Sequence, residues 1–149
     1  MNCVIIEDNK VQQHIISQYV ESTSQLKLVG VYSNVVDIMT KLNNFLNVDV
    51  LFLDVELPLM TGIEFLEKYK PNVRVILITS HKSYALDAFN NDVIDYLVKP
   101  VQYPRFLHSL NKLRDFEKGK DTICIKSSGK MIKLSCNDIL WVKSANEYL

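Results

Sequence analysis

The chain has 149 residues, 48% of them hydrophobic and 23% charged, with 17 Lys and Arg against 17 Asp and Glu. This composition excludes collagen-like, low-complexity and intrinsically disordered proteins. A domain of this length buries roughly two-thirds of its unfolded surface, so it needs no disulfide or structural metal. The formal net charge of zero argues against nucleic-acid binding by electrostatic attraction alone.

Targeting segments and cysteine motifs give little further signal. No apolar run approaches the ~20 residues that span a bilayer, and the first residues lack a basic segment and a cleavage site. We therefore expect a cytoplasmic protein with no membrane partner. Cys3, Cys124 and Cys136 are an odd set without C-x-x-C spacing, which predicts neither a disulfide framework nor a zinc site.

Short apolar runs alternate with helical patterns along residues 1–118. The expected strands are Cys3–Ile6, a weaker Leu26–Tyr32, Val50–Leu53, Val73–Ile78 and Tyr96–Val98. Their continuous apolarity indicates that both faces are covered, which is typical of a parallel sheet flanked by helices. The helical stripes are Val11–Val20, with Asp8 or Asn9 as its cap, Val35–Phe45, Ile63–Leu66, Tyr84–Phe89 and Phe106–Leu113. The order predicts an α/β fold with a doubly wound, five-stranded parallel sheet.

The pattern changes after residue 118. Ile123–Lys126 and Met131–Leu134, separated by a turn at residues 127–130, predict a β-hairpin, and Ile139–Lys143 predicts a further strand. This tail is shorter than the ~40 residues at which a chain usually folds unaided, so it predicts an incomplete domain or an appendage. It carries five basic and three acidic residues, a mild basic bias.

Polar residues follow four of the five expected strands. They are Glu7 and Asp8 after the first, Asp54 after the third, Thr79 and Ser80 after the fourth, and Lys99 and Pro100 after the fifth. Ligands of doubly wound sheets bind beyond the carboxyl ends of the strands. Three carboxylates in one small volume repel one another unless a cation is present. Mg²⁺ suits such a site, because it takes carboxylate oxygens and leaves positions for a phosphate.

Asp54 is the candidate nucleophile, because carboxylates form aspartyl phosphates where a metal and positioning favour attack. Lys99 can pair with a phosphoryl oxygen, and Thr79 can donate a hydrogen bond to another. Each residue also has a purely structural interpretation. The acidic pair and Thr79 can cap helices, Asp54 can open a turn before Pro58, and Lys99 can be a surface lysine. Their convergence on one sheet edge favours the chemical interpretation.

These residues resemble the receiver domain of two-component response regulators, over about 118 residues. The matching segments are Glu7-Asp8, the loop from Asp54 to Gly62 with Pro58 in place, Thr79-Ser80, Tyr96 and Lys99-Pro100. The resemblance implies a flavodoxin-like strand order, 2-1-3-4-5, and a cis peptide before Pro100. The metal ligands that it implies for Mg²⁺ are Glu7, Asp8, Asp54 and the backbone carbonyl of Glu56. It further implies that Asp54 accepts phosphate from a sensor histidine kinase. Glu7 stands where Asp is more common, and its longer side chain can reach the ion through water.

The resemblance also implies a switch. Phosphate would draw Thr79 toward Asp54, and Tyr96 would move inward, although a half-buried tyrosine with a wet hydroxyl is the simpler interpretation. A phosphorylation-promoted homodimer would use the face that includes parts of Ala85–Phe89, Val93–Tyr96 and Tyr103–Leu113. The side chains at Glu56 and His81 tend in this family to set how fast phosphate is lost.

The segments Tyr84–Phe89 and Asp95–Pro100 are most similar to receivers that precede a LytTR-type DNA-binding domain. The tail segments Ile123–Lys130, Asp138–Ser144 and Asn146–Tyr148 resemble the opening strands of that all-β domain. We therefore expect a receiver at 1–118 and the N-terminal fragment of a LytTR-type domain at 119–149, truncated from a transcription regulator. The parent would bind promoter DNA, whereas this chain alone would not do so specifically. A hairpin packed on its own receiver or on a neighbouring chain is the alternative for the tail.

A second function class is a Mg²⁺-dependent phosphatase or phosphotransferase with an Asp nucleophile. Such phosphatases normally need a second Asp two residues after the first as general acid, whereas position 56 is Glu. The sequence therefore favours a phosphoacceptor signalling domain over an enzyme.

Overall fold

The computed structural model of the chain describes residues 1–39, 47–81, 93–120, 122–127 and 130–135. The chain divides into two compact units, Met1–Lys112 and Leu113–Leu149. No helix in these described ranges is long and apolar enough to cross a membrane.

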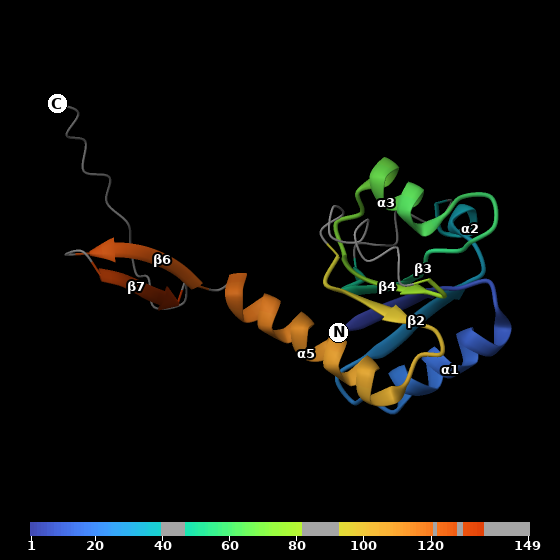
Figure 1. Cartoon of the computed structure of the whole chain (residues 1–149), viewed down its shortest axis with the longest axis horizontal. Coiled ribbons are helices and arrows are strands. Elements are labelled where there is room, and N and C mark those ends of the chain that lie inside the picture. Colours follow the sequence, from blue (N-terminus) through green and yellow to red (C-terminus); the bar gives the residue numbers. More distant parts are fainter. Residues whose placement is uncertain (40–46, 82–92, 121, 128–129, 136–149) are drawn as a thin grey trace. The chain divides into compact units, whose positions relative to one another are not determined.

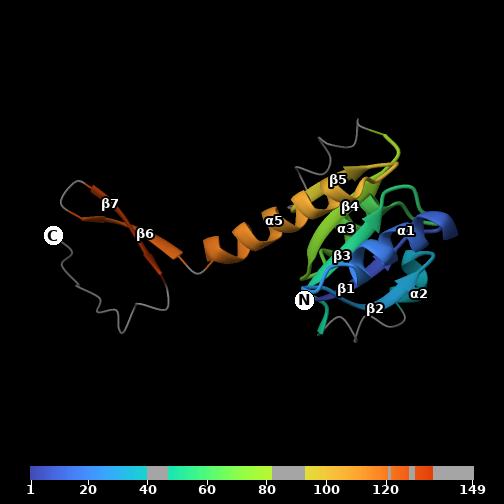
Figure 2. The ribbon, with the colours of Figure 1, turned by 90° about the horizontal axis from the view of Figure 1, so that it is seen from below.

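The first unit is built on a five-stranded parallel sheet of order β2-β1-β3-β4-β5. The strands are β1 (Asn2–Ile6), β2 (Lys27–Tyr32), β3 (Val50–Asp54), β4 (Arg74–Thr79) and β5 (Asp95–Val98). Figure 2 shows β5 at one edge of the sheet and β2 at the other. The strand order and parallel pairing confirm the doubly wound, flavodoxin-like fold that the sequence predicts.

Helices cover both faces of this sheet. They are α1 (Lys10–Glu21), α2 (Val35–Met39), α3 (Gly62–Tyr69) and α5 (Tyr103–Lys120). In Figure 1, α1 and the first turns of α5 lie on one face, and α2 and α3 lie on the other. The rest of the second predicted helix and the predicted helix at Tyr84–Phe89 lie outside the described residues.

The central strand β3 shows why the apolar runs are continuous, since all five of its residues are buried. Leu51 and Leu53 join the core cluster that also contains Phe65 of α3. Side chains alternate along a strand, so Phe52 points to the other face of the sheet, which α1 and the first turns of α5 cover (Figure 1). There its ring stacks on Phe106 of α5, with 5.3 Å between the ring centroids. Each fully buried side chain of this size contributes about 1.5–3 kcal/mol, and the strand is thereby fixed on both faces.

Local capping fixes where two helices begin beside the carboxyl edge. The Asn9 side chain caps α1 by accepting hydrogen bonds from the backbone of Val11 and Gln12. Thr61 and Glu64 form a reciprocal capping box at the start of α3. Gly62 is the first residue of α3, and a Cβ there would lie 2.3 Å from the carbonyl oxygen of Asp54, so only glycine permits this approach of α3 to the end of β3.

The second unit contains an antiparallel pair, β6 (Thr122–Ser127) and β7 (Lys130–Ser135), with Ile125 opposite Ile132. This pair confirms the predicted hairpin. The strand predicted at Ile139–Lys143 lies outside the described residues.

Candidate functional site

Three of the predicted residues meet where β1, β3 and β5 end. The Lys99 ammonium donates hydrogen bonds to Oδ2 of Asp54 at 2.7 Å and to Oε1 of Glu7 at 3.0 Å. The side chains of Glu7 and Asp54 are at most 1% exposed, and that of Lys99 is 14% exposed. The parallel sheet therefore brings together residues that lie up to 92 positions apart in the chain.

Asp8 completes an acidic cluster at this edge. Glu7, Asp8 and Asp54 each offer a carboxylate oxygen within 4.8 Å of the others, and Asp8 is exposed. We call these three residues together with Lys99 the acidic edge. It holds three carboxylates and one ammonium, so it is short of positive charge.

The shortage of positive charge at the acidic edge shifts the pKa values of Glu7 and Lys99. Burial raises the pKa of Glu7 to about 7; the hydrogen bond from Lys99 opposes this rise, and the charge of Asp54 adds to it. Burial acts to lower the pKa of Lys99, but the bonds to Asp54 and Glu7 outweigh it and raise the pKa above its ordinary value. The ammonium therefore stays charged and only partly neutralises its surroundings.

The acidic edge fits a hard divalent cation. Among the described residues, Oε2 of Glu7 is a buried oxygen that accepts no hydrogen bond, although the Lys99 ammonium lies 2.8 Å away as its ion-pair partner. Clustered carboxylate oxygens are the ligands that Mg²⁺ takes while it keeps several waters. Glu7, Asp8 and Asp54 thus present the three side-chain donors of the set that the resemblance implies.

The loop after Asp54 orients its carboxylate. Oδ1 of Asp54 accepts a hydrogen bond from the backbone N–H of Glu56 at 3.1 Å. The Gly62 N–H bonds back to the Val55 carbonyl, which closes the loop. Leu59 at its tip has a φ of 71° and is 86% exposed. Both oxygens of Asp54 therefore have a donor, one from the backbone and one from Lys99.

Thr79 lies at the end of β4, next to β3 in the sheet, and is 1% exposed. Its hydroxyl accepts a hydrogen bond from the His81 backbone at 3.0 Å, and its carbonyl accepts one from the Lys99 N–H at 2.8 Å. The Lys99–Pro100 peptide is cis, as the resemblance implies. Thr79 and Lys99 are thus joined through the backbone at the same edge.

Tyr96 lies on β5, half-buried against the core cluster beneath α2 and α3. Its backbone carbonyl accepts a hydrogen bond from Arg105 at 2.7 Å. Arg105 also forks onto both oxygens of Asp95, at 2.6 and 2.9 Å, and Lys112 donates to the same carboxylate at 2.8 Å. We call Asp95, Arg105 and Lys112 the Asp95 cluster. Sequence reasoning missed it, because a charged residue inside a strand run gives no sign of its partners on a later helix.

Sequence reasoning also missed Gln13 of α1. Its side-chain amide nitrogen donates to the carbonyl oxygen of Glu7 and to the hydroxyl of Ser33, and its oxygen accepts from Lys10. The available signal is its spacing: Gln13 stands three residues before Ile16 and seven before Val20, on the buried stripe of the helix.

The side chains two positions beyond Asp54 and Thr79 contact each other. Nε2 of His81 lies 3.2 Å from Oε1 of Glu56, with exposed fractions of 61% and 42%. This pair connects the β3–α3 loop to the segment after β4. The Glu56 side chain is engaged there, and a metal-ligand role for its backbone carbonyl stays a prediction.

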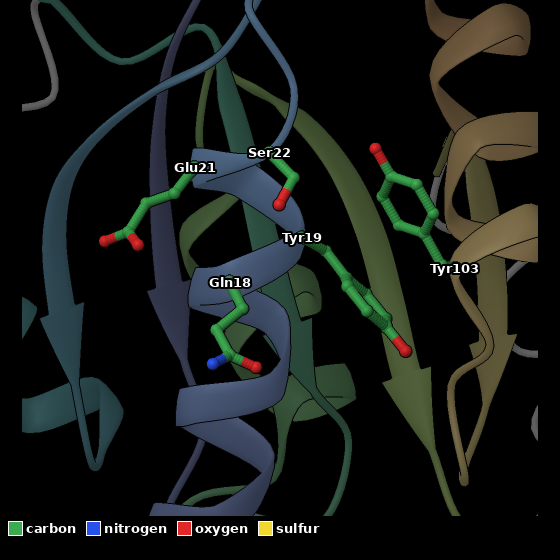
Figure 3. A pocket seen from close by; sticks show the side chains of 5 residues that line it. All are labelled: Gln18, Tyr19, Glu21, Ser22 and Tyr103. Atoms are coloured by element: carbon green, nitrogen blue, oxygen red, sulfur yellow. The ribbon is translucent and has the colours of Figure 1, made fainter.

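A surface pocket of about 470 Å³ lies at the far end of α1 from the acidic edge. Figure 3 shows Tyr19 of α1 and Tyr103 of α5 facing each other across it, and their ring centroids are 5.0 Å apart. The Tyr19 hydroxyl donates to the Val101 carbonyl, so this ring anchors the start of α5 against α1.

Comparisons with known proteins agree with this geometry. Residues 3–111 match the family described as the response regulator receiver domain. An uncharacterized response regulatory protein of Vibrio cholerae is 30% identical, covering 81% of this chain and 52% of its own length. The transcriptional regulatory protein BtsR of Escherichia coli is 27% identical, covering 87% of this chain and 55% of its own length. The crystal structure of the response regulatory domain of protein MrkE from Klebsiella pneumoniae superposes with a TM-score of 0.70 at 28% identity, covering 78% of this chain and 97% of that domain. The chain spans about half the length of the curated relatives that it matches.

Proposed function

Since this chain belongs to the response regulator receiver domain family, we propose that Asp54 accepts a phosphoryl group from a sensor histidine kinase in a Mg²⁺-dependent reaction. An oxygen of the Asp54 carboxylate forms a bond to phosphorus while the bond from phosphorus to the donor's imidazole nitrogen breaks. The histidine takes up a proton and leaves as a neutral side chain. The role is that of a phosphoacceptor in signalling, with no separate substrate to turn over.

The residues of the acidic edge divide the work. Glu7, Asp8, Asp54 and the Glu56 carbonyl would hold the metal, which supplies positive charge to the phosphoryl oxygens when bound. Lys99, already 2.7 Å from Asp54, pairs with a phosphoryl oxygen.

Thr79 donates its hydroxyl hydrogen to a further phosphoryl oxygen once it leaves its present contacts at His81. Phosphoryl transfer depends mainly on such positioning and charge stabilisation.

One observation supports this proposal above the others. Asp54, a buried carboxylate at the end of β3, pairs with the Lys99 ammonium and lies close to two further carboxylates, Glu7 and Asp8. The single ammonium balances only one of these three negative charges. An ordinary structural ion pair would have matched charges. The surplus of carboxylates supports a site that takes up a cation and then a phosphoryl group.

The test is the intact mass of the protein after treatment with acetyl phosphate, with and without Mg²⁺. We expect one phosphoryl adduct that requires Mg²⁺ and is absent in Asp54→Asn. Asp37→Asn, an exposed carboxylate on α2, is the matched control and should keep the adduct. An adduct that persists in Asp54→Asn would contradict the assignment of the phosphoacceptor. Loss of folding in that variant would argue that Asp54 is structural, since Lys99 keeps Glu7 as its ion-pair partner and one negative charge leaves a crowded cluster.

We further propose that phosphorylation moves Tyr96 inward and promotes a homodimer through β5, α5 and the segment Ala85–Phe89, for which the sequence predicts a helix. The Arg105 bond to the Tyr96 carbonyl supports a link from β5 to α5. Sedimentation of the phosphorylated and unphosphorylated chain tests this. A dimer only with phosphate is expected, and a monomer in both states would contradict it.

For the second unit, we propose that residues 119–149 begin a LytTR-type DNA-binding domain of a transcription regulator that acts on promoter DNA. The β6–β7 hairpin supports a β-rich start to this domain, and the similarity to the transcriptional regulatory protein BtsR supports a role in transcription. Selection of genomic DNA fragments by the parent regulator, compared with residues 1–149, is the test. Enrichment of a shared sequence by the parent alone is expected. Equal enrichment by residues 1–149 would contradict the proposal that residues 119–149 are only the beginning of the DNA-binding domain.

A further inference from the structure

Gln13 is a buried polar residue beside the acidic edge, and it bonds to none of the carboxylates there. It is 8% exposed on α1. Its amide nitrogen donates to the Glu7 carbonyl and, at 3.2 Å, to the Ser33 hydroxyl. Its amide oxygen accepts from the Lys10 ammonium at 3.2 Å. One side chain thus ties together the turn after β1, the first turn of α1 and the segment after β2.

The backbone of Glu7 is held from both sides. Its N–H donates to the Tyr32 carbonyl at the end of β2, at 3.0 Å. Its carbonyl has the Gln13 amide as its donor. A buried carbonyl that loses its donor stays desolvated without compensation, so without Gln13 this turn would shift toward water or toward another donor.

That turn carries two of the three carboxylates of the acidic edge. Glu7 and Asp8 are adjacent in the chain, and each has a carboxylate oxygen within 4.8 Å of one from Asp54. This arrangement depends on the backbone conformation of the turn. Movement of the Glu7 carbonyl rotates the peptide between Glu7 and Asp8 and so displaces the Asp8 side chain. The residues behind a metal site commonly set ligand orientation in this way, and their loss weakens metal affinity about 10–100-fold.

We propose that Gln13 is a positioning residue for Mg²⁺: its amide fixes the backbone between Glu7 and Asp8, so that the carboxylates of the acidic edge are arranged before the cation binds. This inference rests on the proposed function. It assigns to Gln13 an effect on how tightly the cation binds, separate from its effect on how stably the chain folds.

The variant that tests this is Gln13→Met, which keeps the length of the side chain and removes its amide. The Mg²⁺ dissociation constant of the full chain is measured by isothermal titration calorimetry. We expect it to rise about 10-fold, at the lower end of the range for such residues. Gln12→Met is the matched control. Among the described residues, the Gln12 side-chain oxygen is buried and accepts no hydrogen bond, so its removal should leave the dissociation constant unchanged.

A second pair of variants separates positioning from stability. Val20→Ala creates a cavity at the far end of the same helix, where Val20 is fully buried. It should lower the stability of the fold and leave Mg²⁺ affinity unchanged. Ser33→Ala removes one acceptor of the Gln13 amide and leaves α1 intact. It should weaken Mg²⁺ binding by less than Gln13→Met does and add little when the two are combined.

The possible outcomes separate a failure of the positioning role of Gln13 from a failure of the proposed phosphoacceptor function. A wild-type chain without measurable Mg²⁺ affinity would contradict the proposed function. Wild-type affinity that is retained in both Gln13→Met and Ser33→Ala would overturn the role of Gln13 alone. An equal loss of affinity in Val20→Ala would also overturn it, because stability would then explain the effect.

Discussion

The acidic edge places three carboxylates around one ammonium, whereas the Asp95 cluster places two cations around one carboxylate. The acidic edge lies at the carboxyl ends of the strands, whereas the Asp95 cluster lies at the first residue of β5, and each joins residues from different elements. The side chains of Asp54 in the first and Asp95 in the second are at most 2% exposed. The two clusters therefore differ in the ratio of charges and in the burial of their cations, since Lys99 is 14% exposed whereas Arg105 is 38% and Lys112 46% exposed.

The ratio decides what each cluster can do. At the acidic edge, burial and the neighbouring carboxylate raise the pKa of Glu7 to about 7 despite Lys99. In the Asp95 cluster burial also acts to raise the pKa of Asp95, but the bonds from Arg105 and Lys112 outweigh it and lower the pKa. A carboxylate such as Asp95, whose two oxygens both accept hydrogen bonds from cations, holds its elements together and needs no further cation. A surplus of carboxylates can bind a cation that the chain does not supply.

Lys99→Ala should have the largest effect on stability. It leaves two buried carboxylates, Glu7 and Asp54, without their shared cation, and removing one partner from a buried ion pair costs about 3–5 kcal/mol. Urea unfolding in the presence of a chelator measures this loss. Added Mg²⁺ should recover part of it, because the metal replaces the missing charge. The variant should still form the phosphoryl adduct but show a weaker phosphate-dependent dimer.

Lys27→Ala, an exposed lysine on β2, is the control and should match the wild type. If Mg²⁺ does not restore any of the stability lost in Lys99→Ala, the contrast between the two clusters fails. The acidic edge would then behave as an ordinary structural ion pair. A normal phosphate-dependent dimer would remove Lys99 from the switch.

Asp95→Asn should have the next largest effect. An amide cannot accept the forked pair of bonds from Arg105, and hydrogen bonds to charged groups contribute about 1.5–3 kcal/mol. The cations left behind are partly exposed and can be hydrated, so the loss stays below that of Lys99→Ala. Mg²⁺ should recover none of it. Recovery by Mg²⁺ would show that the two clusters are not separate in function.

The pH dependence of the same variant gives an independent check. The folded pKa of Asp95 is lowered, so its contribution is complete above the unfolded pKa, about 3.9. It is lost as the pH falls below that value, through the folded pKa. The difference in unfolding free energy between wild type and Asp95→Asn should therefore be constant from about pH 5 to 8 and shrink below about pH 4. A difference that shrinks as the pH rises would have the wrong sign.

The residues of the acidic edge could be predicted from the sequence because the sheet topology alone determines that they lie together. Once β1, β3 and β5 are identified as parallel, the residues after each strand must share one edge, and Glu7, Asp54 and Lys99 do so. The Asp95 cluster could not be predicted in this way. Its partners come from one face of α5, and the rotation of a helix about its axis depends on packing, here on the ring of Phe106 against Phe52.

Gln13 belongs to the same class of omission. Its position on the buried stripe of α1 is visible in the sequence, but its acceptor is a backbone carbonyl, which every residue possesses. Sequence patterns identify side chains that have special chemistry. They do not identify which of many equivalent backbone groups needs a donor.

Lys112→Ala should have the smallest effect of the set, and it compares directly with Lys99→Ala. Lys112 is 46% exposed, and Arg105 keeps its forked contact with Asp95 when the lysine is removed. Such a partly exposed pair contributes less than about 1 kcal/mol, and urea unfolding at two salt concentrations should show a small loss that salt reduces. Both lysines bond to a buried carboxylate at 2.7–2.8 Å, so contact distance alone predicts equal losses. A loss for Lys112→Ala as large as that for Lys99→Ala would mean that contact distance, and neither the ratio of charges nor the exposure of the lysine, sets the stability that each lysine contributes.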